Sequence, residues 1–438
     1  MALAQQILFV LLFIFSVYLF SKNISQIRRN ILLGKPEDTG GTTKDRIRSL
    51  VLLAFGQRKM FANWPVAIMH FIIYAGFIII NIEVVEIILD GTIGSHRLFA
   101  NTLGGFYTFL INVFEILAAL VLLVCVAFLI RRNVMKISRF MKAELDGWPR
   151  SDANYILIAE IILMSLFITM NAIDSNLQPI NEHYTKTDGF VISQYIAPLF
   201  SHFNSGTLVI LERSCWWLHI IGIFAFLNYL PYSKHLHVML AFPNSYYARL
   251  ANTGKMDNMP VIQNEVLYAM QPELAPANAV TPNQFGANDV MDLTWKNLMD
   301  AYSCTECGRC TDACPANITG KLLSPRKIMM DTRDRLQVVG KNINKNGTFV
   351  PDGNTLLNNY ITTEELRACT TCNACVEACP VSISPLSIIV ELRRHLILDA
   401  SNAPTEWNAM FSNVENNFAP WKFSPDDRDA WAVEMNNN

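Results

Sequence analysis

Five long apolar segments in the first 240 residues restrict what this chain can fold into more than any other feature. A helix that crosses the hydrocarbon core of a bilayer needs roughly 20 mainly apolar residues. We interpret the first segment as a span rather than a signal peptide, because no basic stretch precedes it and no small-residue cleavage site follows it. The sequence predicts five transmembrane helices, at Leu3–Phe20, Pro65–Leu89, Gly105–Ile130, Ala153–Met170 and Leu208–Leu230.

The basic residues of the loops predict the orientation of these helices. Nine Lys and Arg residues lie between the first two segments and six between the third and fourth, whereas the other two loops hold only Arg97 and Lys186. Because cytoplasmic loops carry an excess of Lys and Arg, we expect the N-terminus outside and the C-terminus in the cytoplasm. The net charge is −2, without the basic block that is typical of a nucleic-acid-binding protein.

Two copies of one cysteine motif follow the apolar region. The stretches CTECGRCTDACP, from Cys304, and CTTCNACVEACP, from Cys369, hold eight of the ten cysteines. In each C-x2-C-x2-C-x3-C-P motif, three thiolates bind one iron–sulfur cluster and the fourth binds the other cluster of the pair. We predict one [4Fe–4S] cluster on Cys304, Cys307, Cys310 and Cys379, and a second on Cys369, Cys372, Cys375 and Cys314. Zinc is the alternative. Clustered thiols need a reducing compartment, which agrees with a cytoplasmic position.

Histidines in two of the apolar segments indicate a haem. His70 lies in the second segment, and the fifth segment and its continuation carry His219, His235 and His237. His219 and His237 are 18 residues apart, so on one straight helix they share a face about 27 Å apart, with His235 nearly opposite. A haem between helices takes axial imidazoles from two of them. We therefore expect haem b on His70 and one partner, or two haems.

The fifth segment resembles the cytochrome b (gamma) subunit of respiratory nitrate reductase. The related membrane subunits of methanogen heterodisulfide reductase and of the sulfite-reduction-associated complex are similar. The resemblance lies in the spacing of the histidine pair and in the Pro231–Lys234 stretch before its second member, and it covers roughly residues 50–240. The second histidine that the family has in its second span is absent from Ile78–Glu83. The resemblance implies a haem on His70 and His237, with His219 as an alternative partner or as the ligand of a second haem completed from a loop, for example by His202.

Charged side chains also occur inside the apolar segments. Burying charge in a bilayer is costly, so such residues indicate either function or a paired cluster. Counted from the loops, four of them fall near the outer face, namely Glu83, Glu86, Glu212 and Arg213. They predict a quinol pocket with a proton exit, and the alternative is an ion-paired cluster at the interface.

The cysteine-rich part resembles the small iron–sulfur subunit of heterodisulfide reductase. The stretch ACTTCNACVEACPVSISPL and the tail NVENNFAPWKFSPDDRDAW carry the likeness. Between the motifs, Ser324 and Pro325 predict the start of a short helix, and NINKNGTFVPDGN is rich in turn residues. In fused relatives a cysteine-rich catalytic domain with adjacent cysteines follows such a tail. This chain has no Cys-Cys pair, so we expect that domain on a separate subunit.

These observations predict an all-α membrane domain followed by a mainly α, ferredoxin-like domain with two [4Fe–4S] clusters. The expected divisions are a membrane domain at 1–240, a connector at 241–290, the dicluster domain at 291–400 and a tail at 401–438. The resemblance implies a conduit in a bacterial or archaeal cytoplasmic membrane, carrying electrons between a cytoplasmic redox subunit and quinone. The partner would be a cysteine-rich heterodisulfide-reductase-like protein or a flavoprotein. The alternative is a redox-sensing or assembly protein.

Overall fold

The computed structural model describes residues 3–187, 189–251, 256, 258–276 and 284–436. These residues form helices and connecting turns, and among them pairing between extended segments is limited to isolated bridges at Lys35–Thr294 and Leu357–Ile361. Residues 252–255, 257 and 277–283 of the predicted connector lie outside this description. The described part is therefore mainly helical, in agreement with the predicted fold class.

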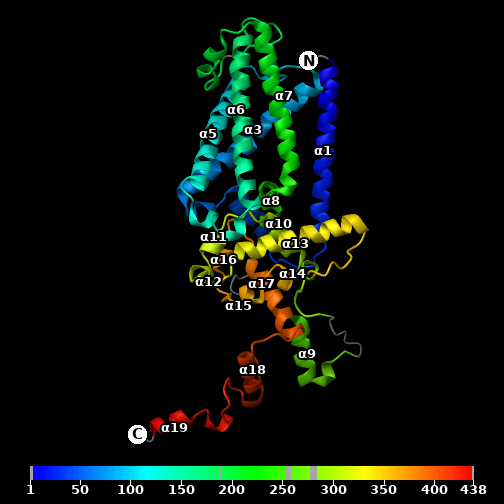
Figure 1. Ribbon diagram of the computed structural model, residues 1–438, viewed down its shortest axis with the longest axis vertical. Coiled ribbons are helices and arrows are strands. Elements are labelled where there is room, and N and C mark those ends of the chain that lie inside the picture. Colours follow the sequence, from blue (N-terminus) through cyan, green and yellow to red (C-terminus); the bar gives the residue numbers. More distant parts are fainter. Residues whose placement is uncertain (1–2, 188, 252–255, 257, 277–283, 437–438) are drawn as a thin grey trace.

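Five long helices stand side by side and form one bundle (Figure 1). Four of them contain a predicted span, and the fifth predicted span ends one residue beyond α7; all five are long and apolar enough to cross a membrane. They are α1 (Leu3–Ile31), α3 (Trp64–Ile93), α5 (Gly105–Asn133), α6 (Trp148–Leu177) and α7 (Ser205–Tyr229). Pro65 and Pro149 occupy the first turns of α3 and α6, where a missing backbone N–H costs nothing.

Side-chain packing arranges these helices as a ring. α6 packs against α5 and α7, α3 packs against α5, and α1 packs against both α3 and α7. Phe9 of α1 is fully buried between its neighbours, with its ring centroid 5.6 Å from that of Trp216. A Cβ atom at Gly91 of α3 would lie 2.6 Å from the Phe9 ring, so glycine is needed for this close approach.

The second unit is a group of mostly shorter helices at one end of the bundle (Figure 1). Capping residues begin its main helices: the side chain of Thr294 accepts a hydrogen bond from Asn297 N, Ser324 does so from Lys327 N, and Thr362 from Glu365 N. The helices are α10 (Trp295–Ser303), α11 (Arg309–Asp312), α12 (Pro315–Ile318), α13 (Pro325–Asn346), α14 (Leu356–Asn359), α15 (Thr363–Arg367), α16 (Ala374–Ala378) and α17 (Pro385–Arg394).

The lower end of α1 joins this unit to the bundle. Ile27 and Ile31 of α1 belong to the same buried apolar core as the helices of the second unit. Lys35 N donates to Leu293 O at 2.8 Å, and Trp295 N donates to Lys35 O at 2.9 Å. We call this end of the bundle the near end and the opposite end, which holds the N-terminus, the far end (Figure 1).

The remaining helices connect or extend these two units. They are α2 (Thr43–Leu50), α4 (Ala100–Leu103), α8 (His237–Tyr246), α9 (Pro260–Met270), α18 (Thr405–Asn417) and α19 (Ala430–Asn436). The tail that carries α18 and α19 runs away from the second unit (Figure 1). α8 packs against α10 and α2, so it lies at the near end, where the chain crosses from the bundle to the second unit.

Candidate functional site

The first cysteine motif curls around a cavity at the near end. The chain leaves α10 at Cys304 and adopts left-handed backbone conformations at Glu306 and Gly308, with φ of 53° and 76°. The cavity holds about 330 Å³ of space, part of which is open to solvent. Four cysteines line it together, namely Cys304, Cys307, Cys310 and Cys379. The fourth of these comes from the other motif.

The second motif gathers its thiols with the remaining cysteine of the first. The Cys369 and Cys375 thiols interact electrostatically with both Cys314 and Cys372. α11 and α16, the short helices within the two motifs, pack against each other. This packing brings the last cysteine of each motif beside the first three cysteines of the other motif. The structure thus places each fourth cysteine beside the opposite motif, while the assignment of cluster ligands stays a prediction.

Four of the eight thiols in these groups are buried, namely Cys304, Cys314, Cys375 and Cys379. Burial, with a contribution from neighbouring thiols, raises the pKa of the Cys304, Cys375 and Cys379 thiols to about 12. Bound metal cations would reverse this, because they favour the thiolate. No three His, Cys, Asp or Glu side chains in the described part of the chain are placed to hold one metal ion.

Three histidines gather at the near end, close to the first motif. α7 ends at Tyr229, and two short turns that include Pro231 redirect the chain before α8 begins at His237. The ring centroids of His235 and His237 are 5.5 Å apart. Both rings interact electrostatically with His70 of α3. We call His70, His235 and His237 the histidine cluster.

The expectation that His219 and His237 share one face of a straight helix, with His235 opposite, is wrong. Leu230–Tyr232 form a 3-10 turn around Pro231, and Ser233 is extended with ψ of 152°. A proline lacks a backbone N–H and its ring clashes with the preceding turn, so the helix cannot continue through it. For this reason the sequence pattern did not predict that His235 lies near His70. Pro231 is the residue that indicates the end of the helix and could have led to that prediction.

Hydrogen bonds orient two rings of the cluster and leave an atom of the third unpaired. His70 Nδ1 lies 3.1 Å from Gln57 Oε1, and His237 Nδ1 lies 2.9 Å from Lys234 O. An imidazole whose Nδ1–H donates to an oxygen presents its Nε2 lone pair, as metal-binding histidines do. His235 Nε2 is buried without a hydrogen-bond partner. The donor set of the cluster therefore fits axial ligation of a haem.

His219 lies apart from this cluster, inside the bundle. Its Nδ1 is 3.0 Å from Leu163 O of α6, and its ring centroid is 6.1 Å from that of Phe167. Ten residues separate it from the end of α7 at Tyr229, about 15 Å along the helix axis. His202, the suggested loop ligand, lies in the loop before α7, where its ring packs beside Phe203.

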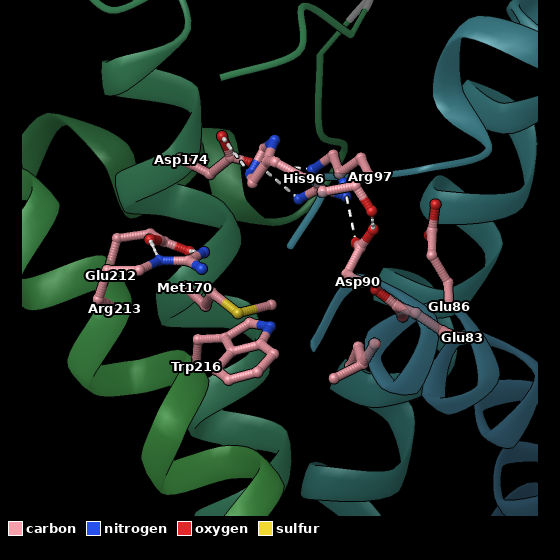
Figure 2. A pocket seen from close by; sticks show the side chains of 12 residues that line it. Glu83, Glu86, Asp90, His96, Arg97, Met170, Asp174, Glu212, Arg213 and Trp216 are labelled. Atoms are coloured by element: carbon pink, nitrogen blue, oxygen red, sulfur yellow. Dashed lines mark hydrogen bonds and ion pairs between the residues drawn. The ribbon is translucent and has the colours of Figure 1, made fainter. Parts of the chain in front are cut away.

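The four charged residues predicted near the outer face line one pocket at the far end (Figure 2). Glu83 and Glu86 come from α3, and Glu212 and Arg213 from α7. Arg213 Nε is 2.5 Å from Glu212 Oε2, whereas Glu83 Oε2 is buried without a partner. The pocket also includes residues that were not predicted from the sequence, namely Asp90, His96, Arg97, Met170, Asp174 and Trp216.

Arg97 is the centre of the hydrogen-bond network around this pocket. Its Nε donates to Asp174 Oδ2 at 2.7 Å, its Nη2 to Asn171 Oδ1 at 2.8 Å and its backbone N–H to Asp90 Oδ2 at 2.8 Å. Tyr107 links the network to α3 by donating to Glu86 Oε2. Burial works against the Arg97 charge, but Asp174, Tyr107 and Glu83 together outweigh it and raise the pKa of Arg97 well above its usual value.

Comparison with known proteins identifies the class of the second unit first. Residues 303–383 match the 4Fe-4S dicluster domain family. One of the subunits of the ferredoxin/F(420)H(2)-dependent CoB-CoM heterodisulfide reductase of Methanosarcina acetivorans is 35% identical over 119 residues, which is 27% of this chain and 60% of that protein. The second unit is therefore a dicluster 4Fe–4S domain.

Two other relatives extend across the membrane part. The "Probable iron-sulfur-binding oxidoreductase FadF" of Bacillus subtilis is 25% identical over 99% of this chain and 61% of its own length. The "EtfAB:quinone oxidoreductase" of Syntrophomonas wolfei is 26% identical over 89% of this chain and 54% of its own length. The chain thus spans somewhat more than half the length of these two relatives. No solved structure matches it.

These findings confirm the predicted combination of two units. The chain joins a multi-pass membrane domain to a dicluster iron–sulfur domain similar to the heterodisulfide reductase relative. Its relatives support electron transfer at a membrane through iron–sulfur clusters.

Proposed function

We propose that this protein carries electrons between a cytoplasmic redox partner and the membrane quinone pool. The observation that carries the proposal is the position of the histidine cluster directly beside the first cysteine motif. Arg309, which precedes Cys310, donates from Nη1 to Lys59 O at 3.1 Å and interacts electrostatically with His70. A dicluster domain and a candidate haem site thus meet at the near end, with lipid on one side and water on the other.

Two [4Fe–4S] clusters are assigned to the two thiol groups. Their support is the shared cavity of the first group, the crossing of the fourth cysteines and the match to the dicluster family. The ligand sets are Cys304, Cys307, Cys310 and Cys379 for one cluster, and Cys369, Cys372, Cys375 and Cys314 for the other. When bound, such clusters supply one-electron relays, and the chain holds them at a fixed separation.

Haem b is assigned to the histidine cluster. His70 with His237 is the first pair, because both rings are held by hydrogen bonds at Nδ1. His235, with its unpaired buried Nε2, is the alternative to His237. A bound haem would supply a further one-electron relay. His219 remains the candidate for a second haem.

The second thiol group is proposed as the face that meets the soluble partner. Cys372 is exposed, whereas Cys304 of the first group is buried. Ile318 and Leu322, which follow the first motif, are 68% and 61% exposed and add apolar surface to the domain. The partner is a cysteine-rich heterodisulfide-reductase-like protein or a flavoprotein. The names of two relatives, one from a heterodisulfide reductase and one an EtfAB:quinone oxidoreductase, support this choice.

The far-end pocket is proposed as the quinone and proton-exchange site. Glu83, Glu86, Glu212 and Arg213 meet there, and the unpaired Glu83 carboxyl oxygen is available to a ligand or a proton. Along α3, His70 and Glu83 are 13 residues apart, about 20 Å. His219 lies within this interval, so a redox centre on His219 would divide the distance into two shorter steps.

The proposed orientation places the near end in the cytoplasm of a bacterial or archaeal cell. The loops that reach the near end hold fifteen basic residues, and the far-end loops hold Arg97 and Lys186. This places the thiols in a reducing compartment.

A quinone-reduction assay on purified membranes tests the function. Membranes containing the chain, given a reduced flavoprotein or a reduced low-potential dye, should reduce a soluble quinone analogue, and the rate should fall in a Cys372→Ser variant. A matched Cys215→Ser variant, changed at a thiol inside the bundle, should keep the rate. Clusters that become reduced without any quinone reduction would favour the redox-sensing alternative.

A further inference from the structure

Lys234 lies where the bundle, the histidine cluster and the dicluster domain meet. Its Nζ is 2.5 Å from Glu306 Oε2 and 2.5 Å from Pro149 O, and 4.0 Å from Asp152 Oδ2. Its backbone carbonyl accepts from His237 Nδ1 at 2.9 Å. One residue therefore binds the first turn of α6, the loop of the first cysteine motif and a ring of the histidine cluster.

Glu306 completes the connection from the dicluster side. It stands between Cys304 and Cys307 in a left-handed backbone conformation, φ 53°, and only 5% of its surface is exposed. Besides Lys234, its carboxylate accepts from Arg333 Nη1 of α13 at 2.7 Å. A non-glycine residue in this conformation is strained, and the two buried ion pairs provide a reason for it to be held there.

The segment that carries Lys234 is itself fixed. Asp152 of α6 accepts from Ser233 Oγ at 2.7 Å, from Lys234 N at 3.1 Å and from Tyr229 OH. The carboxylate is 2% exposed, so these bonds are shielded from water. The turn between α7 and α8 thus cannot shift independently of α6.

We propose that Lys234 and Glu306 form a positioning pair that sets the separation and the electrostatic balance between the first thiol group and the histidine cluster. This inference rests on the proposed function. Electron transfer between two groups depends steeply on their separation, and here a buried ion pair joins the residue between two cysteines to the residue that holds His237. The transfer oxidises one group by one electron and reduces the other by one, and no bond is made or broken.

The charges of Lys234 and Glu306 also predict the direction in which the midpoint potential of the first cluster should shift in each variant. Lys234 adds a positive charge and Glu306 a negative charge at the edge of the first thiol group, in a region where low exposure limits screening. Loss of the cation should make the first cluster harder to reduce, and loss of the anion should make it easier. Loss of either should slow internal electron transfer, because each change releases the contact that fixes the distance.

The test compares Lys234→Met, Glu306→Gln and Lys234→Arg in full-length protein. Electron paramagnetic resonance during redox titration gives the midpoint potential of each cluster, and rapid mixing gives the rate of haem reduction by the clusters. We expect opposite potential shifts for Lys234→Met and Glu306→Gln, and a several-fold lower transfer rate in both, because electron transfer slows as the separation grows. Lys234→Arg should restore most of the rate.

Arg29→Met is the matched control at the same domain boundary. Arg29 of α1 donates from Nη2 to Gly340 O at 3.0 Å, away from both the thiols and the histidines, so its loss should change neither potential nor rate. Unchanged potentials and rates in both pair variants would overturn the inference, as would potential shifts of the same sign.

If the Lys234→Met protein does not assemble its clusters, the nearly isosteric Glu306→Gln variant tests the inference by the same measurements of cluster potential and transfer rate. A wild-type protein without haem would instead overturn the proposed haem site, and the signed cluster potentials would still test the pair.

Discussion

The two ends of the membrane bundle bury polar side chains of different kinds. At the near end, three imidazoles lie together, two held by oxygen acceptors and one with an unpaired nitrogen. At the far end, Arg97 and Arg213 pair with the acidic side chains around them, and the unpaired Glu83 Oε2 is an exception. The near end thus gathers imidazole nitrogens that can bind a metal cofactor, whereas the far end gathers five carboxyl groups with two arginines.

The position of the dicluster domain explains part of this difference. It covers the near end and excludes water there through buried ion pairs such as Lys234–Glu306 and Arg326–Glu144. In the described part of the chain, loops of the bundle itself cover the far end, and one of them supplies Arg97 to the Asp174 carboxylate. Four predictions test this contrast, beginning with the largest expected effect.

The largest effect should follow removal of a ring from the near end. His70→Ala should abolish the low-spin b-type spectrum of the purified protein, because two imidazoles are needed to make the iron six-coordinate. His237→Ala should do the same if His70 and His237 form the pair, and His219→Ala should leave one haem intact. Pyridine haemochrome and visible spectra measure the haem content, and His183→Ala, an exposed loop histidine, is the control.

The same histidine variants test whether His70 and His237 are the two haem ligands. A normal spectrum in His237→Ala together with a lost spectrum in His235→Ala would move the second axial ligand to His235. A protein without haem after His219→Ala, beside a normal His237→Ala protein, would transfer the site into the bundle interior.

Cys314→Ser should have a smaller effect, which is the loss of one of the two iron–sulfur clusters. Cys314 lies beside Cys369 and Cys375, so the change should damage the cluster of the second motif and leave that of the first. Electron paramagnetic resonance on the reduced variant distinguishes the two signals. Cys125→Ser, in the middle of α5, is the control that should keep both. A loss confined to the first motif's cluster would contradict the crossing of the fourth cysteines.

At the far end, Arg97→Met should weaken folding rather than remove a cofactor. The change leaves the buried Asp174 carboxylate without its cation, which typically costs about 3–5 kcal/mol. We expect a lower thermal unfolding temperature in detergent, partly restored by Arg97→Lys, with cluster and haem spectra unchanged below the transition. Lys186→Met, at the other basic residue of the far-end loops, should have no effect, and equal destabilisation by both variants would contradict the network.

A feature of the fold could be predicted from the sequence where the residues that determine it lie close together in the chain. The five spans depend on apolar length alone, and each lies within an observed candidate span. The last turns of α1 were not predicted, because Ile27 and Ile31 are buried by the distant dicluster domain. α13 runs for 22 residues instead of a short helix, since buried residues such as Leu336 and Val339 hold it against the core until Gly347 ends it with φ of 81°.

The candidate sites divide in the same way. Each cysteine motif lies within twelve residues, so the type of cofactor that it binds could be predicted from the sequence. His235 was not, because its position depends on a proline-bent turn rather than on helical periodicity. Arg97 was counted only as a loop charge, because its partners Asp174 and Asn171 are more than 70 residues away in the sequence.

The smallest predicted effect concerns the pH dependence of the near end. Burial raises the pKa of Glu144, but hydrogen bonds from Arg326 and Ser324 outweigh it and hold that pKa below the ordinary value. A carboxyl with a lowered folded pKa stabilises the protein above its ordinary pKa, and this contribution is lost as the pH falls through the folded value.

Glu144→Gln should therefore lower stability at pH 7 by about 1.5–3 kcal/mol, the range for a hydrogen bond to a charged group. It should also flatten the decline of the unfolding temperature as the pH falls toward about 4, the ordinary range of a carboxyl, because the variant has no carboxylate to protonate. Glu377→Gln is the matched control, because its ion pair with Lys59 spans the same boundary at 3.9 Å but its side chain is 79% exposed. If both variants kept the wild-type acid decline, the near end would owe its stability to apolar packing at α1 rather than to the buried ion pairs.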